Sequence, residues 1–413
     1  MPDAETNQEW EIAIVGGGVG GLTLALALHH FGLKATVYEA RPRLSEAGAG
    51  LWISANAMQV FKRLNLSQDI VDAGFEINTI DLRDYKSGTL KKLDLLPLRK
   101  KYGHCIIAVK RATLCSLLAD ALERRSGTAV KFGHSCRSIT VRDKKISILF
   151  GSYQGCNAIT GAEVYTDVDT ISVDCLVGAD GLRSAVRGHL FPDCQSVYAG
   201  QSSWRKIVHG RLDADLKRTS VEIWGKGKRF GFSQIAENEV YWYATVDAPS
   251  TVQPKHRLLA LEGGPPRIFK DFSPVVQYLI NSPPLEPEVH TDIFDLRPLP
   301  QWYQGPIVLL GDAAHATTPN MGQGAAQAVE DAYVLAQSLA QSHRRSGTLE
   351  QAFAQYQATR KRKADIVVRK SNTFGRMAHL KSGIWREFRN AVIRMTPNDV
   401  DMREIDHLYK LNF

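Results

Sequence analysis

The chain has 413 residues, of which 44% are hydrophobic and 23% are charged, so it can bury a sizeable core and form more than one lobe. Its formal net charge is +8, and much of the excess lies late in the chain, between Arg360 and Arg394. These late basic residues fit solvated helix faces, or attraction to an anionic cofactor or a membrane surface, and the absence of a module combining aromatic and basic residues excludes nucleic acid as a partner.

Cysteine usage and the N-terminal apolar run set the expected compartment. The six cysteines (105, 115, 136, 156, 175 and 194) include no CxxC pair and, with no secretory signal, indicate reduced thiols in a cytoplasmic protein. The apolar run 12–28 contains five glycines and follows acidic residues, so we expect neither a signal peptide nor a transmembrane helix. No metal site is expected.

The first predicted elements form a βαβ unit around a glycine-rich loop. Residues 11–15 and 35–38 are short apolar strands, and residues 22–31 are helical and end at Gly32. Between strand and helix, Gly16, Gly18 and Gly21 satisfy the G-x-G-x-x-G pattern. In that pattern the first glycine makes a tight turn, the second lets the backbone approach a pyrophosphate and the third lets helix and strand pack closely. The helix N-terminus adds free N–H groups and the positive end of its dipole.

An acidic residue completes this fingerprint. Glu39 ends the second strand, 18 residues after Gly21, where a carboxylate can accept hydrogen bonds from ribose hydroxyls. A carboxylate there disfavours a 2′-phosphate, so the site fits FAD or NAD better than NADP. The residues predicted to bind the dinucleotide are Gly16, Gly18, Val19, Gly20, Gly21, Glu39, Ala40 and Arg41.

The middle of the chain alternates between helical and strand-like patterns. We predict helices over 56–64 and 111–125, a strand-like stretch over 80–101, a hairpin over 130–149, a surface loop over 151–169 and a buried strand over 174–177. From residue 197 the pattern changes to short strands, at 221–224, 229–235 and 239–247. Residues 249–287 contain many prolines and are predicted to be irregular with one helical patch.

A second glycine-rich strand–loop–helix begins near residue 306. An apolar strand over 306–310 is followed by Gly311-Asp312-Ala313-Ala314-His315, then Pro319 and Gly322-Gln323-Gly324, and most of the chain after Gly324 is predicted to be helical. We expect His315 to be a loop-packing residue rather than a catalytic one. One glycine-rich segment is enough to hold a pyrophosphate, so the second segment needs another role. A bound flavin, which contacts both segments, would explain why the chain has two.

Together these motifs resemble the single-component FAD-dependent monooxygenases, the aromatic hydroxylase and epoxidase family. The resemblance is carried by the glycine loop with Glu39, by the segment 175–187 around Asp180-Gly181, and by Gly311-Asp312 with its following loop. It extends from about residue 10 to about residue 365 and is closer to the salicylate hydroxylase and zeaxanthin epoxidase branches than to others.

The resemblance implies an α/β fold with a discontinuous Rossmann-like FAD lobe, as in para-hydroxybenzoate hydroxylase. The FAD-binding domain would comprise 8–78, 103–192 and 290–345. An inserted antiparallel-sheet substrate domain would comprise 79–102 and 193–289, and residues 346–413 would form a C-terminal helical segment.

The resemblance also implies roles for individual residues. Asp312 would bond the ribityl hydroxyls of FAD, and the loop from Pro319 through Gly322, Gly324, Ala325 and Ala326 would lie against the pyrimidine edge of the flavin. The family often has Asn where Ala326 stands, which removes one side-chain contact but keeps the backbone N–H groups. Gly311, Arg111, Asp180 and the backbone of Ala49 and Gly50 complete the implied cofactor set. Arg183 and Arg187 would serve either nicotinamide nucleotide docking or ion pairs within the lobe.

The implied reaction transfers oxygen from a flavin C4a-hydroperoxide, after NADPH or NADH has reduced FAD and O2 has reacted with it. The substrate would be a hydrophobic, cyclic or aromatic small molecule, and the protein a monomer or homodimer. We expect at least two of the sheet-lobe aromatics Trp204, Trp224, Phe230, Phe232 and Tyr243 to line the substrate pocket. Arg205 is a candidate for steadying a substrate oxyanion, and no general base is evident.

Two other functions remain open from the residues alone. A flavin-dependent halogenase would share the scaffold, but the chain lacks a Trp-x-Trp-x-Ile-Pro signature. A non-catalytic binding protein of the same fold would have no need of Glu39, Asp312 and the loop after Gly322.

Overall fold

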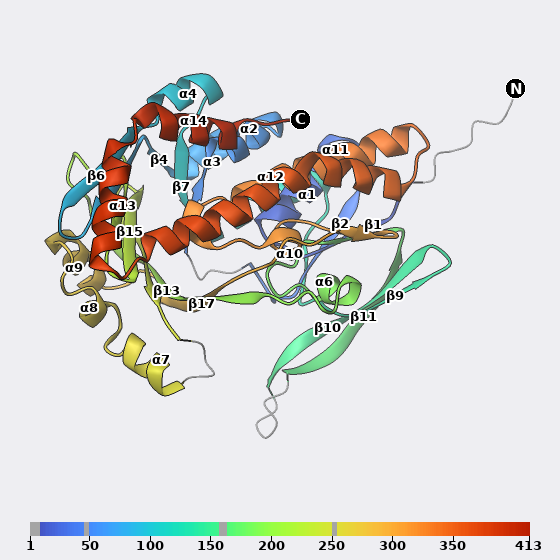
Figure 1. The fold of residues 1–413 in the computed structure, drawn as a ribbon. Helices are drawn as coiled ribbons and strands as arrows, with labels where there is room; N and C mark the ends of the chain where they lie inside the picture. The colour runs from blue at the N-terminus through green and yellow to red at the C-terminus, as the bar shows by residue number, and fades with distance from the viewer. Residues whose placement is uncertain (1–8, 45–48, 157–162, 250–253) are drawn as a thin grey trace, which may run out of the picture.

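The computed structural model describes residues 9–44, 49–156, 163–249 and 254–413, which form two β-sheet lobes with long helices packed beside them (Figure 1). Strands β13 (Val197–His209) and β17 (Val289–Asp295) extend between the lobes (Figure 1). Helix α12 (Leu349–Ala378) runs across the molecule toward the second lobe, where α13 (Gly383–Met395) follows it (Figure 1). The bounds predicted for the domains stay a prediction.

The first lobe contains a six-stranded sheet that is parallel except at one edge. Its strand order is β18-β19-β12-β1-β2-β8, and only the β18–β19 pair is antiparallel. Its strands are β1 (Ile12–Val15), β2 (Ala35–Glu39), β8 (Lys131–Phe132), β12 (Cys175–Gly178), β18 (Tyr303–Gln304) and β19 (Ile307–Leu309). The three predicted strand–loop junctions thus lie on neighbouring parallel strands, and their loops meet at one end of the sheet.

The second lobe is built on a seven-stranded sheet with the order β17-β13-β16-β15-β14-β5-β6. It is antiparallel except where β14 runs parallel to β5. Its strands are β5 (Thr79–Asp84), β6 (Gly88–Asp94), β13 (Val197–His209), β14 (Thr219–Trp224), β15 (Lys228–Ala236), β16 (Glu239–Asp247) and β17 (Val289–Asp295).

Two three-stranded sheets complete the β-structure of the described residues. One contains β3 (Gly50–Ile53), β4 (Phe75–Ile77) and β7 (Ile106–Lys110), and the other contains β9 (Ser135–Arg142), β10 (Lys145–Cys156) and β11 (Glu163–Val173). The surface loop predicted over 151–169 is therefore wrong for its described part, because β10 and β11 pair there as antiparallel strands. Most residues of β11 are at least partly exposed, so its polar composition reflects solvent contact rather than the absence of a strand.

The long helices cover the first lobe. Helix α1 packs against α5 and α11, and α11 packs against α12. The helices are α1 (Val19–His30), α2 (Ala55–Arg63), α3 (Ser67–Ala73), α4 (Leu96–Tyr102), α5 (Arg111–Ser126), α6 (Ala185–Leu190), α7 (Pro254–Leu261), α8 (Gly264–Ile268), α9 (Pro274–Asn281), α10 (Asp312–His315), η1 (Pro319–Met321), α11 (Gly324–Arg344), α12 (Leu349–Ala378), α13 (Gly383–Met395) and α14 (Asn398–Tyr409). Among the helices of the described residues, none combines the length and apolar character needed to cross a bilayer.

Two sequence expectations differ from these elements. Residues 96–102 form α4 rather than continuing the strand-like stretch, since Pro97 occupies the first turn, where a missing N–H costs nothing. The region 249–287 contains three short helices instead of one, each starting with or containing a proline in its first turn. These helices matter because α8 and α9 cover one face of the seven-stranded sheet.

Candidate cofactor and substrate site

The glycine loop after β1 has the geometry that the fingerprint requires. Gly16 has φ +115°, and a Cβ there would lie 2.3 Å from the carbonyl oxygen of Ala179. A Cβ on Gly21 would lie 2.0 Å from the carbonyl oxygen of Gly16, so this glycine allows α1 to approach β1. Gly18, by contrast, has open space where its side chain would be. The loop is therefore closed toward the protein and open on the side where a pyrophosphate would lie.

Of the other residues predicted to bind the dinucleotide, two face the protein interior and two are exposed to solvent. Gly20 faces the protein, because a Cβ there would lie 2.7 Å from a methyl carbon of Leu310, and Val19 is buried. Ala40 and Arg41 are exposed at the end of β2.

Glu39 lies against the glycine loop. Its carboxylate accepts one hydrogen bond from the Gly17 N–H (2.7 Å) and another from the Arg41 N–H (3.0 Å). Each carboxylate oxygen can accept more than one hydrogen bond, so these contacts orient the group and leave capacity for ribose hydroxyls.

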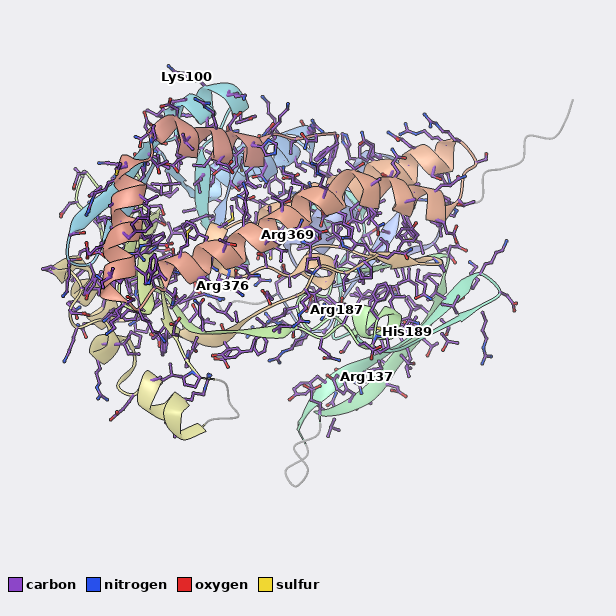
Figure 2. All side chains as sticks on the ribbon, viewed as in Figure 1. Lys100, Arg137, Arg187, His189, Arg369 and Arg376 are labelled. Carbon is purple, nitrogen blue, oxygen red and sulfur yellow. The ribbon has the colours of Figure 1, made fainter. Side chains whose placement is uncertain are left out.

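The segment around Asp180 joins the glycine loop to the second glycine-rich segment. Asp180 accepts a hydrogen bond from the Val186 N–H (3.1 Å), and burial raises the pKa of its carboxyl. Its other carboxylate oxygen is buried without a partner among the described residues. Arg187, in α6 (Figure 2), is buried and donates to the carbonyls of Leu182 (2.6 Å), Ala313 (3.1 Å) and Cys194 (3.3 Å). Arg187 thus braces this segment rather than offering a docking site.

Asp312 begins α10, three residues after the last residue of β19. Its side chain is exposed to solvent, yet burial by the surrounding protein raises the pKa of its carboxyl, while His315, Arg111 and Arg187 oppose that shift. The Asp312 carboxylate is therefore accessible to a ligand although protein atoms surround it densely. A Cβ on Gly324 would lie 3.8 Å from its Oδ1, so Asp312 and the start of α11 border the same space.

A second acid, Asp331, supports this loop from behind. It is fully buried and binds the Gly311 N–H (3.1 Å), His315 (2.5 Å) and Arg360 (2.8 Å). Burial alone would raise the pKa of Asp331, but the charges of His315 and Arg360 outweigh it and lower the pKa to about 2. His315 is a buried packing residue, as expected, and also lies 4.9 Å from the ring of Trp302.

The support extends to the start of α11. Arg360 also binds Glu330 and Gln327, and Gln323 donates to Ser54 (2.8 Å) and accepts from Asn56 (3.2 Å). No local sequence pattern predicts this hydrogen-bond network, because its residues are far apart in the chain. The one visible signal was the acidic pair Glu330-Asp331 within the largely apolar helix.

The loop from Pro319 to Ala326 turns sharply at Gly322, which has φ +61°. Pro319 is exposed, Gly324 and Ala325 are half-buried, and Ala326 is fully buried. Substitution of the family's Asn by Ala therefore falls at a position that packs into the core.

Strand β3 and the start of α5 form a third side of the site. The Arg111 N–H donates to the carbonyl of Ala49 (3.1 Å), and the Arg111 side chain is exposed, within range to affect the pKa of Asp312. A Cβ on Gly50 would lie 2.4 Å from the ring of Tyr241. Trp52 lies between the lobes: a Cβ on Gly322 would be 3.5 Å from its indole, and its Nε1–H donates to Ser233 (3.0 Å).

The seven-stranded sheet presents a polar face toward Trp52. Tyr243 packs edge-to-face on Trp52 with 5.8 Å between ring centroids, and its hydroxyl donates to Glu222. Glu222 also accepts from Arg229 (3.2 Å), and Arg229 donates to Asn320 in η1 (2.5 Å). Arg229 is 1% exposed, so its hydrogen bond to Asn320 is a buried link between the sheet and the second glycine-rich loop.

Three of the five aromatics expected to line the pocket lie on the other face of this sheet. Trp204, Phe230 and Phe232 are buried in a cluster with Phe269 and with Leu279 from α9. The interpretation of these three as pocket residues therefore requires correction: they are core. Phe230 and Phe232 do share a face, as the alternation indicated, but α8 and α9 cover it.

The remaining two aromatics lie on the polar face. Trp224 is buried against Ala378 at the end of α12, and its Nε1–H donates to Glu222 (2.5 Å). Tyr243 alone of the five contacts Trp52. Arg205 lies directly across from Tyr243 in the β13–β16 register and is half-buried. Among the described residues it has no ion-pair partner, so its charge is available to a ligand.

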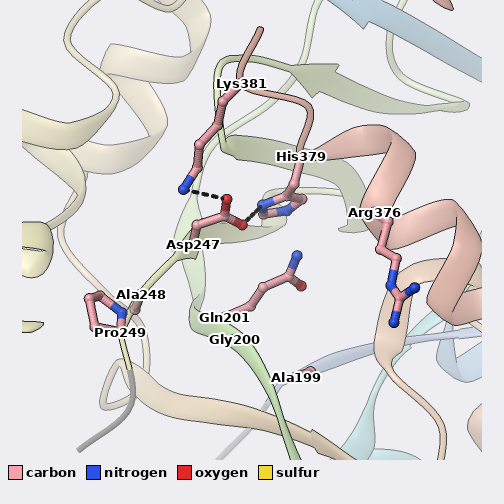
Figure 3. Close-up of a pocket in the computed structure, with 9 residues that line it drawn as sticks. All are labelled: Ala199, Gly200, Gln201, Asp247, Ala248, Pro249, Arg376, His379 and Lys381. Carbon is pink, nitrogen blue, oxygen red and sulfur yellow. Dashed lines mark hydrogen bonds and ion pairs between the residues drawn. The ribbon is translucent and has the colours of Figure 1, made fainter. Parts of the chain in front are cut away.

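A separate pocket of 510 Å³ lies at the end of β13 and β16, beside the end of α12 (Figure 3). Within it, the Asp247 carboxylate binds His379 (2.7 Å) and Lys381 (3.0 Å), and Arg376 and Gln201 extend from opposite sides. None of the predicted cofactor residues lines it, so we do not assign it to the cofactor.

The residues around the glycine loop fit FAD. The open side of Gly18, the partly free Glu39 carboxylate and the accessible carboxylate of Asp312 suit a pyrophosphate, a ribose and a ribityl chain in turn. The N-terminus of α11 lies beyond Asp312, where its dipole would stabilise negative charge on a reduced ring.

Comparison with known proteins agrees with this geometry. The profile of the family described as "FAD binding domain" matches residues 9–256 and 293–371. The chain is 34% identical over 395 residues to an aurachin C monooxygenase/isomerase from Stigmatella aurantiaca, covering 95% of this chain and 96% of the relative. It is 28% identical over 403 residues to a 2-heptyl-3-hydroxy-4(1H)-quinolone synthase from Pseudomonas aeruginosa, covering 94% of each.

The fold has solved counterparts. The structure of Klebsiella pneumoniae HpxO complexed with FAD and uric acid is similar with a TM-score of 0.80 and 25% identity, covering 97% of this chain and 96% of that chain. A salicylate hydroxylase substrate complex is similar in fold, with a TM-score of 0.72 and 19% identity over 94% of this chain and 93% of that one. The chain therefore belongs to the FAD-binding domain family and is a flavoprotein monooxygenase.

Proposed function

We propose that the protein hydroxylates a hydrophobic, aromatic small molecule with a quinolone-type ring and an apolar chain, using FAD, O2 and either NADPH or NADH. The observation that carries this proposal is the polar face of the seven-stranded sheet, which turns Tyr243 and Arg205 toward Trp52 and the second glycine-rich loop. Two relatives covering more than nine tenths of the chain carry aurachin C and a heptyl-hydroxyquinolone in their names.

We propose that FAD is held by the backbone of Gly16, Gly18 and Gly21, by Glu39 and by Asp312, with Arg111 near its phosphates or ribityl chain. Bound FAD would supply reduction by the nicotinamide cofactor and activation of oxygen. Gly324 and Ala325 would present backbone N–H groups to the ring, and Gly322 would turn the chain into the start of α11. Gly311, Asp180 and the backbone of Ala49 and Gly50 would hold the surrounding loops. The buried link from Arg229 to Asn320 would fix the sheet against that loop, so that substrate and cofactor keep one spacing.

Tyr243 and Arg205 would recognise the polar atoms of the ring. Burial and the nearby Glu222 carboxylate raise the pKa of Tyr243 well above its ordinary value, so the phenol stays protonated near neutral pH. Its proton is donated to Glu222, which leaves the phenol oxygen as an acceptor for a ring N–H. The unpaired cation of Arg205, directly across the strand pair, suits a ring carbonyl or oxyanion.

We propose a cytoplasmic location for the enzyme. Cys105, Cys115, Cys136, Cys175 and Cys194 are all unpaired in the structure, which fits a reducing compartment. The proposed assembly is a monomer or a homodimer.

Substrate screening of the purified, flavin-loaded protein tests the proposal. We expect 2-alkyl-4(1H)-quinolones to stimulate NAD(P)H oxidation with matching O2 uptake and to yield a product heavier by one oxygen atom. Salicylate and urate, which lack the apolar chain, serve as comparison substrates. Coupled hydroxylation of urate or salicylate but not of any alkylquinolone would contradict the substrate class and leave the flavin chemistry intact. A colourless protein that takes up no FAD would contradict both.

A further inference from the structure

Helix α13 has its apolar residues on the outside. Of its 13 residues, Ile384 is 82% exposed, Trp385 and Phe388 61%, Val392 47% and Met395 81%. Their spacing places them along one side of the helix. Figure 1 shows α13 beside the strands of the second lobe, where it is in contact with β6.

The polar side of α13 holds the helix in this orientation. Arg386 and Arg389 are buried and lie 3.6 and 3.7 Å from the carboxylate of Asp84. Arg389 also donates to the carbonyl of Met377 (2.9 Å), and its guanidinium lies 4.7 Å from the ring centre of Trp224. The helix is thus attached through charged groups, and its apolar side points outward as a consequence.

None of these five exposed residues belongs to a hydrophobic cluster of the described part of the chain. Trp385 and Phe388 contact each other edge-to-face, with 6.0 Å between their centroids. Single exposed apolar residues are common on protein surfaces, whereas apolar residues grouped on one exposed face mark an interaction site.

We propose that this outer face of α13 docks the enzyme onto an anionic membrane surface. The two ends of the helix carry exposed cations: Lys381, which is 64% exposed just before α13, and Arg394 near its end. Glu387 is the one acidic residue in the helix, whereas the whole chain has a net charge of +8. An apolar face with an indole and flanking cations is the pattern of helices that lie in the bilayer interface.

Further cations lie near the start of α13. Lys381 also lines the 510 Å³ pocket at the end of β13 and β16, together with Arg376 (Figure 3). Arg376 projects from α12, as does Arg369 one heptad earlier (Figure 2). The cations Arg376 and Lys381 therefore lie close together, just before the start of α13.

Vesicle sedimentation of the flavin-loaded enzyme tests the proposal. We expect binding to mixed phosphatidylcholine–phosphatidylglycerol vesicles and weaker binding to phosphatidylcholine alone. The double variant Trp385→Ser/Phe388→Ser should lower the partition coefficient about tenfold or more, because both apolar groups insert into the interface. The variant Lys381→Gln/Arg394→Gln should weaken binding to the anionic vesicles only.

A matched control and three outcomes make the test decisive. Leu258→Ser removes another exposed apolar side chain, 72% accessible on α7, and should leave vesicle binding unchanged. The bound flavin spectrum and the unfolding midpoint verify that each variant is folded. Absence of wild-type binding, or equal binding by the Trp385→Ser/Phe388→Ser variant, would overturn the proposal. So would a concentration-dependent dimer that this variant abolishes without any vesicle binding, since the face would then be an interface between two copies.

Discussion

The two faces of the seven-stranded sheet use the same strands for different purposes. On β15, Phe230 and Phe232 point into an aromatic core under α8 and α9, while Arg229 and Ser233 point toward the FAD lobe. The core face needs only apolar volume. The other face buries a guanidinium and a carboxylate, which is costly unless they are paired, and here Arg229 and Glu222 also bond to Asn320 and Tyr243. Aromatic content alone therefore does not distinguish the two faces, whereas buried polar groups do.

Truncating the core face should have the largest effect. Phe230→Ala is expected to lower the free energy of unfolding by about 3–5 kcal/mol, because it leaves a cavity among Trp242, Phe232 and Phe269. Turnover per flavin-loaded, folded molecule should stay close to that of the wild type. Denaturant unfolding and steady-state kinetics measure the two quantities. Lost turnover at unchanged stability would place Phe230 in the substrate site and break the distinction between the faces.

Removing one hydroxyl from the polar face should show the opposite pattern. Tyr243→Phe is expected to reduce kcat/KM for the oxygenated substrate by about tenfold, while unfolding changes by no more than about 1.5 kcal/mol. Tyr198→Phe is the matched control, because the Tyr198 hydroxyl donates to the carbonyl of Ala248 (3.0 Å) at the edge of the same sheet. Equal losses of kcat/KM in both variants would mean that the Tyr243 hydroxyl has only a structural role.

The polar face should also confer a modest pH dependence on stability. Burial lowers the pKa of His379, which bonds Thr245 (3.0 Å) and Asp247 (2.7 Å). The unfolded state then takes up the proton more readily, so stability is full above the unfolded pKa of about 6.5 and declines as the pH falls below it. Unfolding midpoints measured between neutral and mildly acidic pH should decline less in His379→Gln than in the wild type. An identical decline in both proteins would assign the effect to other groups.

The local motifs could be predicted from the sequence, whereas the pairing of distant surfaces could not. The sequence predicts the roles of Gly16, Gly21 and Asp312, because each stands at a tight turn or a strand end and belongs to a short sequence motif. Alternation likewise showed that Phe230 and Phe232 share a face. It could not show which face is covered, because the covering helices α8 and α9 lie in a proline-containing region with weak helical signals.

The same reason explains what was missed at the site. Arg229 and Asn320 are 91 residues apart, and Trp52 and Ser233 are 181 apart, so no local spacing links them. The polar side of α13 is buried because Asp84, Tyr85 and Trp224 receive its arginines. An amphipathic pattern alone predicts the reverse orientation.

Flavin binding by Asp312→Ala tests the central claim most directly. The carboxylate of Asp312 is accessible, and within the described residues its side chain makes no hydrogen bond, so its loss should cost the apoprotein little stability. We predict that the variant, titrated with FAD after removal of bound flavin, binds about tenfold or more weakly than the wild type, since it loses charge-assisted hydrogen bonds to the ribityl hydroxyls. The apoprotein unfolding midpoint should be unchanged. Wild-type affinity and stoichiometry in the variant would contradict the assignment of this segment to the flavin.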